Sequence, residues 1–188
     1  MDKKTFRKQQ LERLSQMTST DRQQQNLALQ TQLFTSSTWQ AARTIAMTIS
    51  SGIEVATRPL IEHAWADGKM VVIPKTLPKR QMAFYPYQEA SQLERTAFGI
   101  LEPVSGEPVS KQQIGLILVP GLGYSRDQRA RIGFGGGYYD RYLADYTGKK
   151  LTLAYDQMVF EHAEWPVDRY DVLLDELLVA GDEQHDKN

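Results

Sequence analysis

The chain has 188 residues, of which 41% are apolar and 24% are charged, close to the average of globular proteins. Its formal net charge is −1, so it lacks the basic excess that is typical of proteins whose main ligand is nucleic acid. The chain contains no cysteine, which excludes disulfides, zinc–thiolate sites and thiol nucleophiles.

Hydrophobic spacing predicts two helices within residues 1–36, packed on the rest of the chain. The first covers about residues 3–16, and its apolar side holds Phe6, Leu11, Leu14 and Met17. Residues 18–21, Thr-Ser-Thr-Asp, offer N-cap side chains for a second helix that ends near Phe34. The N-terminal residues do not resemble a secretory signal and no apolar run could span a membrane, so we expect a cytoplasmic protein without membrane contact.

After residue 43 the pattern alternates between strands and helices. Strands are predicted at 44–50, 70–73, 81–87, 114–119, 151–155 and 176–180. Helices are predicted at 57–67 and 138–146, separated by an irregular excursion at 88–114 and a loop at 120–137. We expect Gly68 to end the first of these helices and Pro74 to stop the second strand.

This alternation predicts one domain of the three-layer α/β/α class with a mainly parallel central sheet. Residues 182–188 are interpreted as a flexible tail. Ligands of such sheets bind beyond the carboxyl ends of the strands. That rule directs attention to Glu54, to the 120–140 loop and to the segment after Tyr155.

The segment from Val119 to Leu143 contains Gly133, Gly135, Gly136 and Gly137 directly before a predicted helix. Glycine lets consecutive amides approach a ligand closely, and a helix N-terminus adds a partial positive charge. The flanking arginines are Arg126, Arg129, Arg131 and Arg141. This combination suits a polyphosphate, although a tight turn that packs the helix on the sheet would need the same glycines. Neither a Walker A string nor a G-x-G-x-x-G string is present.

Asp140 would lie on the first turn of the helix, beside such phosphates. A carboxylate in this place is suited to Mg²⁺, which prefers oxygen ligands. Charge compensation of the helix N-terminus explains the residue equally well. The pattern by itself leaves both interpretations open.

The string RIGFGGGYYD, residues 131–140, resembles the signature of the 5-formyltetrahydrofolate cyclo-ligase family. Other similar segments occur in the expected order at Lys3–Arg7, Glu54, Phe98–Pro103, Val119–Gly121 and Pro166–Asp171, so that the resemblance extends over nearly the whole chain. The chain departs from the pattern in two places. Tyr124–Asp127 replaces a common Phe-Asp turn, and Arg169-Tyr170 replaces a common Pro-His pair.

The resemblance implies a monomeric enzyme that closes 5-formyltetrahydrofolate to 5,10-methenyltetrahydrofolate with ATP and Mg²⁺, releasing ADP and phosphate. It implies ATP contacts at Lys3, Lys4, Thr5, Phe6, Arg7, Arg131, Ile132, Gly133, Phe134, Gly135, Gly136, Gly137, Tyr138 and Tyr139. It implies folate contacts at Ile49, Glu54, Phe134, Gly135, Gly136, Gly137 and Tyr138. Asp140 and Asp171 would hold Mg²⁺, and Arg131 and Lys3 would be the catalytic cations.

Two alternatives fit the same pattern. A sugar-phosphate isomerase-like enzyme could use the glycine-rich loop as a phosphate cup, and it would not need ATP. A non-enzymatic nucleotide- or RNA-binding module could use the N-terminal lysines and the loop arginines. The near-neutral net charge argues against RNA, and failure to bind folate would favour this second alternative.

Overall fold

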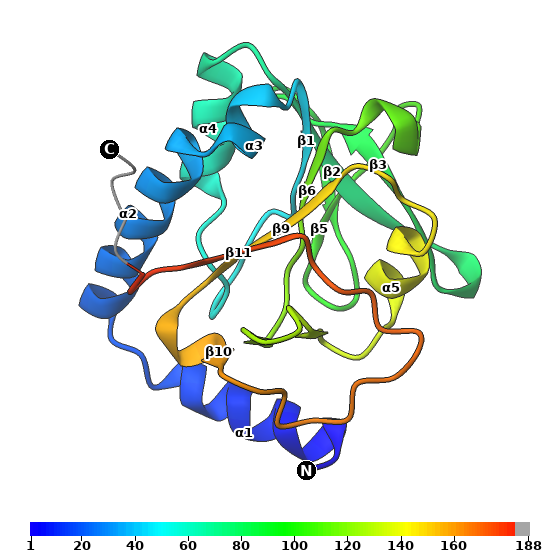
Figure 1. Cartoon of the computed structure of the whole chain (residues 1–188). Coiled ribbons are helices and arrows are strands. Elements are labelled where there is room, and N and C mark those ends of the chain that lie inside the picture. The colour runs from blue at the N-terminus through cyan, green and yellow to red at the C-terminus, as the bar shows by residue number, and fades with distance from the viewer. Residues whose placement is uncertain (183–188) are drawn as a thin grey trace.

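A six-stranded sheet with the order β11-β9-β6-β1-β2-β3 forms the centre of the computed structural model, which describes residues 1–182 (Figure 1). The strands are β1 Thr44–Ala46, β2 Met70–Leu77, β3 Gln81–Pro86, β6 Leu116–Leu118, β9 Lys149–Ala154 and β11 Glu176–Val179. Neighbouring strands are parallel except for the antiparallel pair of β2 and β3. The predicted mainly parallel α/β sheet is confirmed.

The helices are α1 Lys3–Ser15, α2 Ser19–Thr35, α3 Ser37–Ala41, α4 Arg58–Ala66 and α5 Tyr138–Leu143. The predicted cap at the start of α2 is confirmed, since the Thr18 side chain accepts a hydrogen bond there, and Asp2, for which no cap was predicted, accepts hydrogen bonds in the same way at the start of α1. Figure 1 shows α2, α3 and α4 on one side of the sheet and α5 on the other. The one-turn helix α3 was not predicted, because five residues are too few to show a helical period.

Helix α1 buries a narrower stripe than its apolar residues predict. Phe6 and Leu14 are buried, but Leu11 is 41% exposed and Gln10 takes the buried position between them. The Nε2 atom of Gln10 donates a hydrogen bond to the Gln157 carbonyl at 2.7 Å. Placing Leu11 on the buried side was therefore wrong, because α1 touches the core along a single i, i+4 row.

Pro74 does not stop β2, which continues through it to Leu77 and pairs Pro74 with Phe84 of β3. The carbonyl of Val72 accepts from the amide of Met47 on the β1 side. Since alternate residues of a strand face the same neighbour, the nitrogen of Pro74 also faces that side. There β1 has already ended at Ala46, so the missing N–H leaves no ladder bond unmade.

The predicted loop 120–137 contains two short strands, β7 Gly123–Ser125 and β8 Arg131–Ile132. They form a second sheet with β10, Val159–Phe160, in the order β10-β7-β8. Strands of two or three residues show no alternation in sequence, which explains why the loop prediction missed them. The predicted excursion carries the two-stranded sheet of β4 Leu93–Arg95 and β5 Leu101–Pro103. Short 3₁₀ turns are η1 Pro78–Arg80, η2 Lys111–Gln113 and η3 Asp156–Met158.

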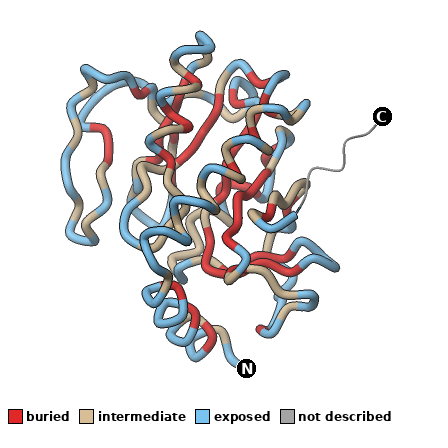
Figure 2. The backbone as a smooth tube through the Cα atoms, turned by 90° about the vertical axis from the view of Figure 1, so that its left-hand side faces the viewer, coloured by how far each residue is buried: buried red, intermediate tan, exposed pale blue. Residues whose placement is uncertain are grey.

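The strand order reverses direction between β1 and β6. The chain adds β2 and β3 on one side of β1, and later adds β6, β9 and β11 on the other side. Such a switch point leaves a crevice at the carboxyl ends of the two central strands. Figure 2 shows that many of the buried residues run through the middle of the molecule, with exposed residues mostly around them.

The end of the chain is held as far as Asp182, whose carboxylate pairs with Arg126 at 2.7 Å. The rest of the predicted tail, residues 183–188, lies outside the described residues. Across residues 1–182 none of the helices combines the length and apolar character that crossing a membrane requires.

Candidate active site

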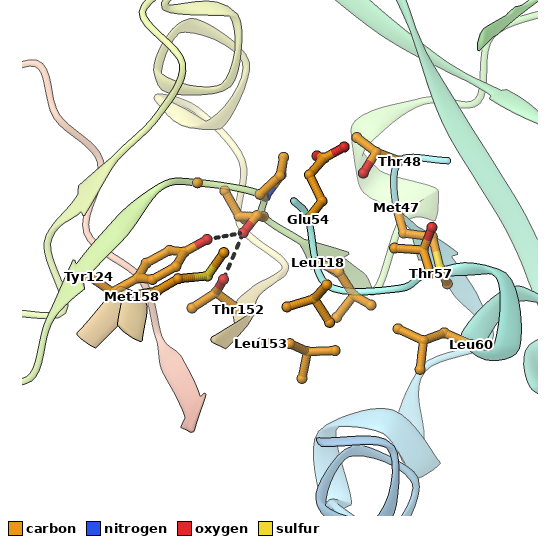
Figure 3. Close-up of a pocket in the computed structure, with 14 residues that line it drawn as sticks. Met47, Thr48, Glu54, Thr57, Leu60, Leu118, Tyr124, Thr152, Leu153 and Met158 are labelled. Carbon is orange, nitrogen blue, oxygen red and sulfur yellow. Dashed lines mark hydrogen bonds between the residues drawn. The ribbon is translucent and has the colours of Figure 1, made fainter. Parts of the chain in front are cut away.

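A pocket lies at the switch point, beyond the carboxyl ends of β1, β6 and β9 (Figure 3). Its lining residues are Met47, Thr48, Glu54, Val55, Thr57, Leu60, Leu118, Val119, Pro120, Gly121, Tyr124, Thr152, Leu153 and Met158. Most of these side chains are apolar, and the polar ones come from three different segments. This composition is typical of a site that binds a small organic ligand and orients it with few polar groups.

The end of β6 is held by two buried hydroxyl groups that the sequence analysis did not select. The carbonyl of Val119 accepts from Thr152 at 2.8 Å and from the Tyr124 hydroxyl at 3.4 Å, as Figure 3 shows. Burial raises the pKa of Tyr124 to about 12, so its hydroxyl stays a neutral donor. The available signal was Thr152, a polar residue within the otherwise apolar run of residues 151–155.

Glu54 extends into this pocket from the loop that follows β1 (Figure 3). Its Oε2 atom accepts a hydrogen bond from the Ser51 amide at 2.9 Å. Burial raises the pKa of the Glu54 carboxyl above its ordinary value, and the Ser51 bond offsets only part of that shift. Ile49 packs half-buried against the core and does not line the pocket.

The glycine-rich loop follows β8 and turns into α5. Gly137 caps the helix in the left-handed conformation, with φ at 70°, which favours glycine. A Cβ atom at Gly133 would lie 2.5 Å from Nη1 of Arg131, so the loop approaches this guanidinium closely. Helix α5 has only six residues, fewer than predicted, and its N-terminus therefore contributes little to an anion site.

Arg131 is the central cation of the site, and its side chain is only 4% exposed. Nη1 donates to the Pro120 carbonyl and Nη2 to Oδ1 of Asp140, both at 3.0 Å. The guanidinium lies 5.8 Å from the ring centre of Tyr139. Among the described residues, neither Arg131 Nε nor the buried Tyr139 hydroxyl has a hydrogen-bond partner.

Helix α1 brings two further cations to the same place. Lys3 and Arg7 are one helical turn apart and share a face. Nζ of Lys3 contacts Asp168 at 2.7 Å and Asp171 at 2.8 Å, while Nε of Arg7 donates to the Gly133 carbonyl at 2.8 Å. Burial alone would lower the pKa of Lys3, but the bonds to the two carboxylates raise it above its ordinary value.

Asp140 and Asp171 face the same small region. Oδ1 of Asp140 accepts from the amide of Val172, the residue that follows Asp171, at 3.2 Å. Each aspartate is paired with one protein cation, Asp140 with Arg131 and Asp171 with Lys3. The structure therefore brings together five of the residues predicted to bind nucleotide or metal, from three distant segments of the chain.

Other predicted contacts lie differently. Phe6 and Ile132 turn their side chains into the core, whereas Lys4, Thr5 and Phe134 are exposed. The remaining positions of the predicted stretch, Gly135, Gly136 and Tyr138, belong to the loop itself and the first turn of α5.

The expected cluster of four arginines is only partly present. Arg126 forms a two-point ion pair with Asp182, and Arg129 donates to the Asp175 carbonyl. Arg141 is exposed and donates to the Gly137 carbonyl. Counting Arg126 and Arg129 toward the anion site was therefore wrong. In their place Arg7, supplied by α1, approaches the glycine-rich loop.

Known proteins resemble this chain over most of its length. The family model described as 5-formyltetrahydrofolate cyclo-ligase family matches residues 1–180. A Mus musculus protein named 5-formyltetrahydrofolate cyclo-ligase is 27% identical, with 94% of this chain and 92% of the mouse chain aligned. The protein of the same name from Escherichia coli K12 is 29% identical, over 82% of this chain and 88% of the bacterial one.

Solved structures of similar proteins cover the whole fold. The NMR structure of Aquifex aeolicus 5,10-methenyltetrahydrofolate synthetase has a TM-score of 0.83 and 27% identity, covering 100% of both chains. A 5,10-methenyltetrahydrofolate synthetase from Mycoplasma pneumoniae has a TM-score of 0.75 and 25% identity, covering 95% of this chain and 98% of the other. Since a single family model accounts for residues 1–180 and these neighbours share the complete fold, the chain belongs to the 5-formyltetrahydrofolate cyclo-ligase family.

Proposed function

We propose that the protein closes 5-formyltetrahydrofolate to 5,10-methenyltetrahydrofolate, using ATP and Mg²⁺ and releasing ADP and phosphate. Besides the family membership, one observation carries this proposal. Pro120 lines the pocket at the switch point, and its carbonyl is also the acceptor for buried Arg131. The apolar pocket that holds the Glu54 carboxylate therefore shares a wall with the glycine-rich loop and its cation Arg131. A reaction between a reduced pterin and a nucleotide requires two such adjacent sites.

The reaction needs activation of a poor electrophile. In a formamide the nitrogen lone pair donates into the carbonyl, and the oxygen is a poor leaving group. We infer that the formyl oxygen attacks the γ-phosphorus of ATP, breaking its bond to ADP. N10 of the folate then attacks the formyl carbon, inorganic phosphate leaves with the oxygen, and N10 loses its proton to solvent. Such a scheme requires positioning and charge neutralisation instead of a protein nucleophile.

The chain's own residues fit these tasks. Arg131, Lys3 and Arg7 would hold the phosphates as charge moves between oxygens. Glu54 would orient the pterin or formyl end by hydrogen bonding from inside the pocket. The partly exposed glycine loop lets both reacting groups approach the backbone closely. Because Arg131 and Lys3 are paired with Asp140 and Asp171, phosphate binding has to compete with these ion pairs.

The carboxylates of Asp140 and Asp171 fit Mg²⁺ in chemistry and in place. Both are partly buried and lie on adjacent segments, and Mg²⁺ commonly uses one or two carboxylates together with phosphate oxygens and water. No group of three or more acidic, histidine or cysteine side chains forms a metal site within residues 1–182. Bound there with the nucleotide, the ion would neutralise charge on the triphosphate.

The metal role predicts a specific defect in Asp171→Asn and Asp140→Asn. Each variant should need about tenfold more Mg²⁺ for half-maximal binding of an ATP analogue. Losing a carboxylate that binds a metal ion, or that supports one of its ligands, typically costs about ten- to hundredfold in metal affinity. Titration calorimetry at fixed nucleotide measures this directly. Asp145→Asn, which removes an exposed carboxylate paired with Lys111, is the matched control. A wild-type Mg²⁺ requirement in both site variants would argue against the metal assignment.

The function itself is tested by mixing protein, 5-formyltetrahydrofolate and Mg-ATP, and following the methenyl chromophore in the near ultraviolet. We expect product only when ATP is present, with one ADP formed per methenyl group. Turnover of sugar phosphate without ATP would favour the isomerase-like alternative. Nucleotide binding without any folate binding would favour the binding module. The family membership supports neither alternative.

A further inference from the structure

The loop that presents Glu54 is closed at its base by two reciprocal hydrogen bonds. The Ser50 amide donates to Oγ1 of Thr57, and the Thr57 amide donates to Oγ of Ser50, each at 2.9 Å. Between these ends the backbone turns through Gly52, whose φ is 58°, and the tip at Ser51 is exposed. The base is therefore fixed locally, but these bonds do not set the direction in which the tip points.

Two residues from distant elements hold the loop from outside. Asn26, near the middle of α2, accepts at its Oδ1 from the Ala56 amide at 3.0 Å. Tyr155, directly after β9, places its hydroxyl 3.1 Å from the same Oδ1 atom and 3.2 Å from the Glu54 carbonyl. These hydrogen bonds of Asn26 and Tyr155 form a tie that joins α2, the end of β9 and the backbone of Glu54 itself.

The burial of this tie makes it an effective constraint. Tyr155 is 1% exposed, so its hydroxyl has little water to replace a lost partner. Burial also raises the pKa of Tyr155, which keeps the hydroxyl a donor at neutral pH. The guanidinium carbon of Arg22 lies 5.9 Å from the centre of the Tyr155 ring, and the same guanidinium donates to the Leu14 carbonyl. The helix pair α1–α2 is therefore connected to the position of the pocket carboxylate.

We propose that Tyr155 and Asn26 are positioning residues that fix the Glu54 loop and thereby set the affinity of the pocket for the folate. This inference rests on the proposed function. Neither residue lines the pocket, so each acts through the loop backbone and not by contact with the substrate. A site residue carried on a loop needs such support, because a loop opens locally more easily than a strand or helix.

The first test replaces Tyr155 with phenylalanine, which removes only the hydroxyl. We expect the dissociation constant for 5-formyltetrahydrofolate, measured without ATP by fluorescence or calorimetry, to rise about three- to tenfold. Affinity for an ATP analogue should stay within twofold. Tyr146→Phe is the matched control, since Tyr146 is also buried and donates one hydrogen bond, to the Ile114 carbonyl, at the opposite end of β6. It should lose comparable stability but no folate affinity.

The second test uses Asn26, whose Oδ1 atom accepts both bonds. Asn26→Asp keeps an acceptor of the same shape, whereas Asn26→Leu removes it. We expect faster hydrogen exchange at the Ala56 amide and weaker folate binding in Asn26→Leu, with both values close to wild type in Asn26→Asp. This rescue separates a loss of the hydrogen bonds from a change in packing of α2.

Unchanged folate affinity in Tyr155→Phe and Asn26→Leu would overturn the proposal, as would an equal loss in Tyr146→Phe. A Glu54→Gln arm keeps this result distinct from a failure of the proposed function. If Glu54→Gln weakens folate binding while the tie variants do not, the pocket assignment stands and the tie is only structural. If wild-type protein binds no folate, the proposed function fails first.

Discussion

Replacing Arg131 with alanine should produce the largest decrease in the free energy of unfolding and in kcat/KM for ATP. The guanidinium is nearly fully buried and donates hydrogen bonds to both the Pro120 carbonyl and the Asp140 carboxylate. Removing it leaves a partly buried carboxylate without its cation, which costs about 3 kcal/mol of unfolding free energy. Loss of a charge-assisted phosphate contact of about 1.5–3 kcal/mol should also lower kcat/KM for ATP roughly ten- to hundredfold.

Urea unfolding and steady-state kinetics with ATP varied measure these two effects separately. Arg131→Lys should recover stability better than it recovers kcat/KM, because lysine can still neutralise Asp140 but cannot present a planar pair of N–H donors to a phosphate. Arg141→Ala is the control, since Arg141 is an exposed arginine beside the same loop and donates to the Gly137 carbonyl. A folded Arg131→Ala protein with wild-type dependence on ATP would remove Arg131 from the phosphate site.

Glu54→Gln should weaken the binding of 5-formyltetrahydrofolate while making the protein more stable at neutral pH. Loss of a charged hydrogen bond to the ligand, worth about 1.5–3 kcal/mol, corresponds to roughly ten- to hundredfold in affinity. Stability should rise because glutamine has no charge to desolvate and can still accept from the Ser51 amide. Such an exchange of stability for function is common where a site carries a buried charge.

The gain in stability of Glu54→Gln over wild type should depend on pH, because the pKa of Glu54 is raised in the folded protein. In the wild-type protein the folded chain binds the Glu54 proton more readily than the unfolded chain does, so protonation of Glu54 stabilises the fold. This contribution is fully present below the ordinary glutamate pKa and is lost as pH rises through the raised pKa. The melting temperatures of Glu54→Gln and wild type should therefore agree near pH 4 and separate toward pH 8. A difference that stays constant over this range would show that ionisation of Glu54 is not the cause.

The sequence by itself determined the elements with strong local signals. The helix cap at Thr18 and the stop at Gly68 lie where predicted, because capping depends only on neighbouring residues. The parallel sheet followed from the alternation of apolar strands with helices. The carboxyl-end rule also selected Glu54, the 120–140 loop and the segment after Tyr155, because the chain order of strands restricts where a crevice can form, and each of the three contributes to the pocket.

Only the tertiary structure decided which charged side chains pair with one another. Lys3, Arg7, Arg131 and the two aspartates come from three segments whose spacing in sequence says nothing about distance, whereas Arg126 and Arg129, close in sequence, turn to other partners. Pro74 was misjudged for the same reason, since its effect depends on whether a neighbouring strand is present. Asn26 and Tyr155 carry no local signal at all, because a tie between α2, β9 and a loop exists only after the chain has folded.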